Sequence, residues 1–161
     1  MLISYPILSA HIGAAADEDD RLQRMVGHEL LLEGTYPVSH DGRWHGGVHL
    51  DTRGEPVRAI ADATVECFRV PSRSEEYPGQ GPYDTGFVLL KHQTETGDAT
   101  PVVFYSLYMH LRPLAELAPT EQAALPAFLR EAATDAVIRG HSLPAAQQRI
   151  WRKDVLGYGG R

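Results

Sequence analysis

Two histidines and an aspartate lie close together in the segment Trp44-His45-Gly46-Gly47-Val48-His49-Leu50-Asp51. We expect this segment to be a strand, in which side chains alternate between two faces. His45, His49 and Asp51 would then share one face, while the apolar Val48 points into the core. Imidazole and carboxylate groups are ligands that zinc prefers. The pattern therefore predicts a metal site.

A histidine pair at this spacing also occurs without any metal, so the pair alone is weak evidence. An α-helix would bring His45 and His49 together equally well, because they are four residues apart. However, Gly46 and Gly47 and the turn-like residues 52–56 argue against a helix here. The context of the pair therefore matters more than the pair itself.

Two further histidines each close a predicted strand. His110 ends residues 101–110, at the edge of the sheet where functional groups usually emerge, on the same face as Tyr108. His92 ends residues 86–92 on the face of Val88 and Leu90, so a hydrogen-bonded core role is the favoured interpretation. His110 is thus the better candidate for chemistry.

The elements that would position these residues are mostly strands. Alternating apolar residues predict strands over 56–60, 64–70, 86–92 and 101–110, in an antiparallel, mainly β arrangement. Between the second and third of these, residues 71–85 form a loop rich in Pro, Gly and Ser that would contact substrate or solvent.

The character of the chain changes after Leu111. Residues 113–140 are rich in Ala, Leu and Glu and predict helices over 120–125 and 127–139, with Thr120 as N-cap and Gly140 as the stop. An apolar face would pack the second helix on the sheet. It comprises Leu129, Ala132, Ala133, Ala136 and Val137. Residues 150–156 return to a strand-like pattern.

Composition sets broad limits on partners. The 161 residues suit a single domain, and a net charge of −6 without a basic run argues against a nucleic-acid partner. The single cysteine, Cys67, excludes an internal disulfide. We find no membrane-spanning stretch and no signal peptide, since residues 1–16 lack a basic leader.

In order along the chain, these motifs resemble the lysostaphin/LytM-type zinc metalloendopeptidases, which hydrolyse peptides of bacterial peptidoglycan. The resemblance covers residues 36–111 through His45-Gly46-Gly47-Val48-His49, then Gly54-Glu55-Pro56-Val57-Arg58-Ala59, then Tyr108-Met109-His110-Leu111, and it extends weakly over 150–160. It implies an antiparallel sheet or sandwich of the LytM (duplicated hybrid motif) type. It also implies a bound Zn²⁺ and, for His110, the role of the family histidine that activates water or stabilises the oxyanion.

Two departures from the family pattern leave the third zinc ligand open. His49 stands where the family has an acidic ligand, and the chain stops before the family's late H-x-H motif. Catalytic zinc needs about three protein ligands and an open water position. The last ligand would therefore come from a complementary C-terminal fragment, or from Asp51, or the domain is degenerate and lacks the chemistry.

The domain boundaries and partners follow from the same resemblance. Residues 1–35 would be an extension that packs on a LytM-like domain at 36–161, incomplete at its C-terminus, with a helical insertion at 113–148. The substrate would be peptidoglycan peptides, in a groove walled by residues 41–44 and 71–85. Without a signal peptide, we expect an exported antibacterial effector that acts in the periplasm or outside the cell. It would have an immunity protein or a secretion-system component as partner. The alternative is a non-catalytic domain that binds the cell wall or activates a partner hydrolase; a weaker one is a metal-binding β domain unrelated to the wall.

Overall fold

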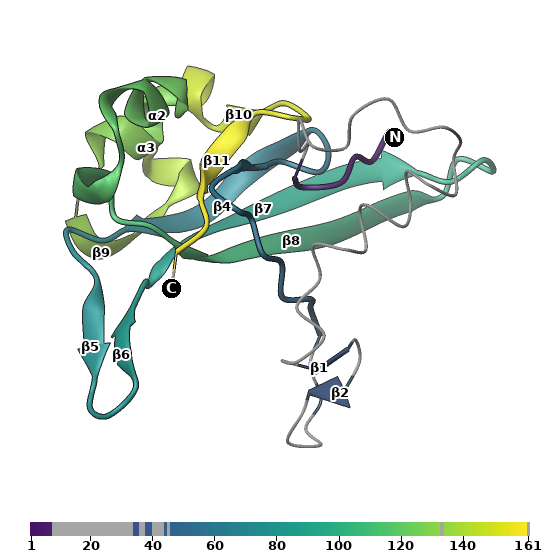
Figure 1. Ribbon diagram of the computed structural model, residues 1–161. Coiled ribbons are helices and arrows are strands. Elements are labelled where there is room, and N and C mark those ends of the chain that lie inside the picture. Colours follow the sequence, from purple (N-terminus) through teal and green to yellow (C-terminus); the bar gives the residue numbers. More distant parts are fainter. Residues whose placement is uncertain (8–33, 36–37, 40–43, 45, 133, 161) are drawn as a thin grey trace, which may run out of the picture.

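The computed structural model describes residues 1–7, 34–35, 38–39, 44, 46–132 and 134–160. Its fold is mainly β with antiparallel pairing throughout, as the sequence predicts (Figure 1). The strands are β1 (Gly34–Thr35), β2 (Val38–Ser39), β3 (Pro56–Arg58), β4 (Ala63–Val70), β5 (Glu75–Tyr77), β6 (Gly81–Tyr83), β7 (Gly86–Glu95), β8 (Pro101–Leu111), β9 (Thr134–Arg139), β10 (Arg149–Ile150) and β11 (Val155–Tyr158). The helical elements are η2 (Leu114–Glu116), α2 (Pro119–Ala124), α3 (Ala127–Glu131), η3 (Gly140–Ser142) and η4 (Ala145–Gln147).

The main sheet has the strand order β10-β4-β7-β8, with β9 paired to β4 as well. Its longest pairing is the β7–β8 hairpin, whose register places Leu89 opposite Leu107 and His92 opposite Phe104. The strands predicted over 64–70, 86–92 and 101–110 are therefore confirmed, and each extends by one to three residues. Buried positions alternate along β7, whereas in β4 a bulge between Val65 and Cys67 shifts the alternation, so that Ala63, Val65, Phe68 and Val70 are buried.

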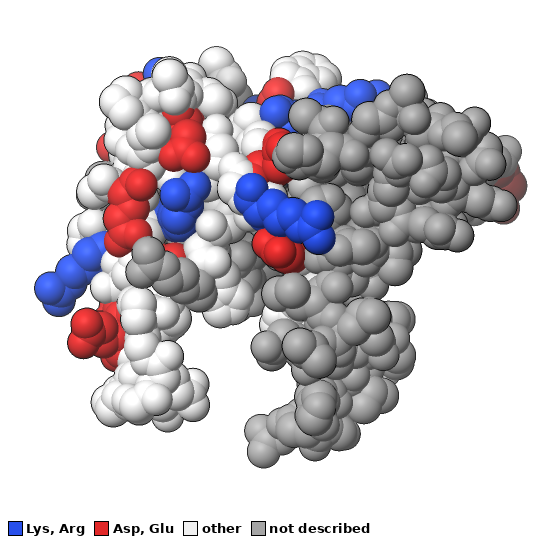
Figure 2. Space-filling view, viewed as in Figure 1, with Lys and Arg blue, Asp and Glu red and all other residues white. Residues whose placement is uncertain are grey.

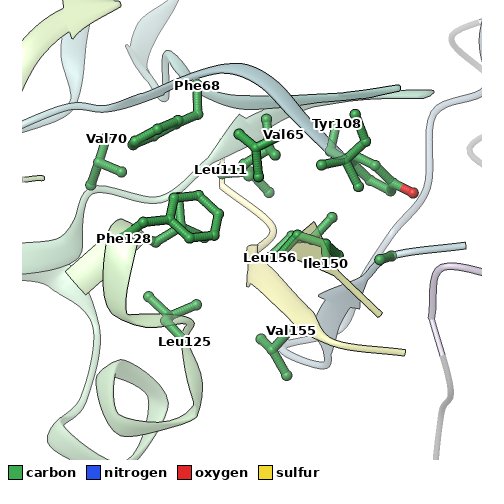
Figure 3. Close-up of a cluster of buried hydrophobic side chains, with 14 of the residues drawn as sticks. Val65, Phe68, Val70, Tyr108, Leu111, Leu125, Phe128, Ile150, Val155 and Leu156 are labelled. Atoms are coloured by element: carbon green, nitrogen blue, oxygen red, sulfur yellow. The ribbon is translucent and has the colours of Figure 1, made fainter. Parts of the chain in front are cut away.

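The core lies between one face of this sheet and the layer that carries α2, α3 and β11 (Figure 3). Val65, Phe68 and Tyr108 point from the sheet toward Phe128 and Leu156, and Phe68 meets Phe128 edge to face at 4.9 Å. Edge-to-face contact suits the charge distribution of aromatic rings. This core holds rigid the strands whose ends form the candidate site.

The chain passes through a small second sheet in which β11 pairs with β3. Residues 1–7 run beside β3, where Ile7 is buried and forms an isolated bridge with Val57. Ser4 N and Arg58 N donate to carbonyls across this contact, at 2.7 and 2.8 Å. The strand-like pattern predicted over 150–156 is resolved into β10 and β11, separated by a turn.

The helix predicted over 127–139 is wrong in its second half. The helix α3 ends at Glu131, and β9 follows and pairs with β4, with Ile138 opposite Phe68. Thr134, Val137 and Ile138 are β-branched and suit a strand, so pairing with the open edge of β4 prevails over the alanine-rich helical pattern. Val137 is 56% exposed, so the predicted apolar helix face does not exist.

The helix predicted over 120–125 is present, but it begins one residue earlier than predicted. The helix α2 covers Pro119–Ala124, and its N-cap is Ala118 rather than the predicted Thr120. The Glu121 carboxylate accepts the Ala118 N–H at 2.8 Å and takes over the capping role. Pro126 separates the two helices, as predicted.

Candidate functional site

His110 lies near the end of β8, and its side chain is exposed. Its backbone has φ of +56°, a left-handed conformation that costs a non-glycine residue about 1–2 kcal/mol. Strained residues of this kind concentrate at functional sites. The conformation arises where β8 meets the end of the chain, since Gly160 N donates to the His110 carbonyl at 2.7 Å.

The imidazole of His110 has one nitrogen held and the other available. Nδ1 lies 3.1 Å from the carbonyl oxygen of Asp84. Because a carbonyl can only accept a hydrogen bond, Nδ1 must carry the proton. In the neutral ring, Nε2 then presents its lone pair outward. A side chain in this state can take a proton from a water molecule.

Asp84 is a site residue that sequence reasoning missed. It is 1% exposed, and its carboxylate Oδ1 accepts the Ser74 hydroxyl at 2.6 Å. A methyl group added at Gly160 would collide with Asp84 Oδ2, so the end of the chain packs directly against this carboxylate. Charged residues are rarely this buried unless they have partners. The one signal in the sequence was an acidic residue two positions before an apolar strand.

The Ser74 hydroxyl also lies 2.7 Å from Glu116 Oε1. Ser74 therefore joins three segments: the base of the β5–β6 hairpin, Asp84 and the η2 turn. A hydroxyl has one proton to donate, so it can serve only one of the two carboxylates at a time. The arrangement fixes the carbonyl that holds His110.

The predicted metal-binding segment differs from expectation. Trp44 and the residues 46–51 contain no strand, and only Trp44 and Leu50 are single bridge residues. Val48 is 49% exposed, so the prediction that it points into the core is wrong. The adjacent glycines explain the difference, because they weaken a strand. His45 lies outside the described residues.

The segment at 49–52 and His110 are brought to the same part of the molecule. Gly159 forms a bridge with Leu111, and a methyl group added at Gly159 would lie 2.5 Å from Thr52 Oγ1. Gly159 is thus packed between Thr52, which follows Asp51, and Leu111, which follows His110. Figure 1 shows the end of the chain, in yellow, beside β8 in this way. Gly159 therefore links the residue that follows the predicted metal-binding segment to the residue that follows His110.

The carboxylate of Asp51 is engaged in its own turn. Oδ1 accepts the Arg53 N–H at 2.9 Å, and Oδ2 lies 3.6 Å from Arg53 Nε. Arg53 and Gly54 both have positive φ, so the turn is tight and the carboxylate stabilises it. As a third zinc ligand, Asp51 would have to share or give up these turn contacts.

No three groups of the His, Cys, Asp and Glu types lie close enough together to hold a metal ion within the described residues. His49 is half-buried and keeps the chemistry of a zinc ligand. A zinc site that includes His49 would therefore need at least one donor from outside the described residues, such as His45.

His92 and Tyr108 belong to the core. His92 is 0% exposed, and its Nδ1 donates to the Asp62 carbonyl at 3.0 Å, while Nε2 lies 2.7 Å from Ser106 Oγ. The Tyr108 hydroxyl accepts the Ile60 N–H at 3.0 Å and bonds Ser106 at 3.2 Å. Both nitrogens of His92 are satisfied, as the core interpretation predicts.

The loop at 71–85 forms a hairpin that projects from the body of the domain (Figure 1). Strands β5 and β6 pair with Tyr77 opposite Gly81, and Tyr77 is 57% exposed. The hairpin ends directly before Asp84, whose carbonyl holds His110. It therefore stands at one side of the candidate site.

Figure 2 shows acidic and basic side chains interspersed over the described part of one face, with no continuous basic surface there. In the described part of the chain, no helix is long and apolar enough to span a bilayer. No known protein family, curated protein or solved structure matches the chain. The likeness to LytM-type enzymes therefore rests on the motifs alone.

Proposed function

We propose that this chain is a zinc-dependent endopeptidase that hydrolyses peptide bonds of peptidoglycan. The observation that carries the proposal is the state of His110, exposed at the end of β8 with Nδ1–H bonded to the Asp84 carbonyl. A general base must present a free lone pair within reach of the proton it removes. His110 Nε2 meets the first requirement.

The proposed zinc ligands are His45 and His49, with Asp51 or a donor from outside the described residues as the third. Zinc bound there would lower the pKa of a water molecule and polarise the scissile carbonyl. His110 would accept the proton of that water or donate to the developing oxyanion. Packing of Gly159 against Thr52 supports a common site, because it joins the two segments.

An extended peptide would be bound beside the β5–β6 hairpin. Tyr77 and Trp44 are both exposed aromatic residues, at 57% and 76%. Aromatic side chains bind apolar parts of a ligand while exposing little polar surface. In the proposal, the hairpin and the segment around Trp44 form the walls of the substrate groove.

The test is hydrolysis of purified peptidoglycan with added zinc by the wild type and by His110→Asn. Asparagine tolerates positive φ, so the variant removes the imidazole without adding strain. We expect a loss of about 10²- to 10⁴-fold in rate with zinc binding retained. The control is His141→Asn, which changes an exposed histidine on η3 and should leave the rate unaffected. Equal rates in the wild type and His110→Asn would refute the assignment.

A specific observation favours a second function. The Asp51 carboxylate is hydrogen-bonded within its own turn, where it also lies beside Arg53 Nε. A domain without metal would bind the cell wall or activate a partner hydrolase through the same groove. Pull-down with insoluble peptidoglycan separates the two: the second function predicts binding that a chelator does not change and no new peptide ends.

The proposed setting is that of an exported antibacterial effector acting in the periplasm or outside the cell. Such a protein requires a cognate immunity protein in its producer. An immunity protein would cover the groove and His110. Protection of Trp44 or Tyr77 fluorescence from a soluble quencher on addition of the partner would test this arrangement.

A further inference from the structure

We propose that Asp84 is a positioning residue for His110. Its carboxylate anchors the peptide unit whose carbonyl oxygen keeps the His110 proton on Nδ1. The catalytic value of this contact rests on the proposed function. The hydrogen bond itself is a property of the fold and can be measured in the absence of any substrate.

The contacts of Asp84 form a clamp around His110. The main-chain carbonyl of Asp84 accepts from the ring at 3.1 Å. Its side chain packs against Gly160, which in turn donates to the His110 carbonyl at 2.7 Å. One residue therefore holds the ring directly and the backbone of the same histidine through Gly160.

The side chain of Asp84 is itself held in place by Ser74. The Ser74 hydroxyl lies 2.6 Å from Asp84 Oδ1 and 2.7 Å from Glu116 Oε1, and Asp84 is 1% exposed, so the carboxylate has little freedom to turn. Burying a carboxylate is unfavourable unless it is hydrogen-bonded. Holding the Asp84 side chain in place also holds its main-chain carbonyl, which faces His110.

The position of the proton on His110 decides what the ring can do. With Nδ1–H donated to a carbonyl, Nε2 is the acceptor that faces outward. If the carbonyl moved, the ring would rotate, and the two tautomers would mix. A displacement of about 1 Å at a catalytic group can cost about 10²-fold in rate. Asp84 would act through this geometry and would not touch the substrate.

The experiment measures the ring nitrogens of His110 by two-bond ¹H–¹⁵N correlation spectra, with the signals assigned by their loss in His110→Asn. The variants are Asp84→Ala and Ser74→Ala. Asp84→Asn serves as the conservative variant, because its amide oxygen can still accept from Ser74. The matched control is Ser72→Ala, which removes a hydroxyl bonded to Asp135, on β9.

We expect the wild type and Asp84→Asn to show the Nδ1–H form of His110. Asp84→Ala and Ser74→Ala should show a mixture of the two tautomers, and Ser72→Ala should match the wild type. On peptidoglycan, the rate should fall roughly 10- to 100-fold in the two alanine variants and recover in Asp84→Asn.

A pure Nδ1–H form in folded Asp84→Ala and Ser74→Ala would overturn the proposal. Should Asp84→Ala fail to fold, Ser74→Ala alone carries the test, since it removes only an oxygen atom. A mixed tautomer in these variants, together with an inactive wild type, would support the positioning role and refute the proposed enzyme function. The experiment therefore distinguishes a failure of the positioning role from a failure of the proposed enzyme function.

Discussion

His92 and His110 lie on the two strands of one hairpin but in opposite environments: His92 is buried and His110 is exposed. His92 has both nitrogens within hydrogen-bond distance of Asp62 and Ser106, whereas His110 has Nδ1 held by Asp84 and Nε2 facing outward. A ring with both nitrogens satisfied in the core stabilises the fold. An exposed ring that has one nitrogen held by a hydrogen bond can exchange a proton at its other nitrogen.

The core role of His92 predicts a stability effect. His92→Leu removes the partner of the Asp62 carbonyl and one of the two partners of the Ser106 hydroxyl, so unfolding in urea should show a loss of about 2–4 kcal/mol. His141→Leu, at an exposed position, should stay within about 0.5 kcal/mol of the wild type. Adding Ser106→Ala to His92→Leu should recover part of the loss. A neutral His92→Leu would contradict the core assignment.

At the same scale, alternation along a strand was enough to predict the role of His92, because Val88 and Leu90 share its face. The role of Asp84 could not be predicted in this way. Its contacts with His110 and Gly160 join residues far apart in the sequence, and a main-chain carbonyl carries the most important one. The pattern of side chains along a sequence does not indicate which main-chain carbonyl will accept a hydrogen bond from a distant residue.

At the scale of elements, the strands β4, β7 and β8 were predictable because each buries one alternating face. The segment 127–139 was not, because residues 134–139 pair with the edge of β4 and the register of that pairing is a tertiary property. Glycines at 46 and 47 likewise break the strand predicted at 44–51. The local sequence pattern therefore gave a wrong prediction where the edge of a sheet or a turn determines the structure.

The junction between β9 and η3 predicts a matched pair of glycine substitutions. A methyl group at Gly140 would collide with the Val65 carbonyl of β4, whereas nothing lies within 4 Å of one at Gly97, in the β7–β8 turn. Gly140→Ala should cost about 1–3 kcal/mol or more in a denaturant titration, as overpacked sites do. Gly97→Ala should be nearly neutral. Equal stabilities for the two variants would show that β9 is not seated on β4 as described.

At the scale of the whole molecule, the mainly β class and a single buried core follow from the pattern of strands. The assembly of a site does not, because it depends on how the end of the chain returns to β8. Gly159 packs between Thr52 and Leu111 and thereby joins the predicted metal segment to His110. No spacing in the sequence predicts that contact.

The buried tyrosines of the core predict the alkaline limit of stability. Burial raises the pKa of Tyr108 above its usual value of 10.0, and burial together with Glu121 raises that of Tyr158. A raised pKa favours the neutral form in the folded state. This contribution is therefore fully present below about pH 10 and is lost as pH rises through the folded-state values.

The free energy of unfolding should consequently fall as the pH rises above about 10. Tyr108→Phe, which has no hydroxyl to ionise, should show a shallower fall, although it starts lower because the bond to Ile60 is lost. Tyr77→Phe, at an exposed position, should follow the wild type. Urea titrations across this range make the comparison, and an identical slope for Tyr108→Phe and the wild type would exclude Tyr108 as a cause.

The central claim is that this fold hydrolyses peptide bonds of peptidoglycan through His110 and zinc. The most direct measurement is mass spectrometry of peptidoglycan fragments after incubation with the zinc-loaded wild type. The account predicts fragments that have gained one water at a peptide bond, formed by the wild type and absent with His110→Asn or a chelator. Intact peptides under all three conditions, with the protein folded and bound to the wall, would contradict it and establish a binding domain instead.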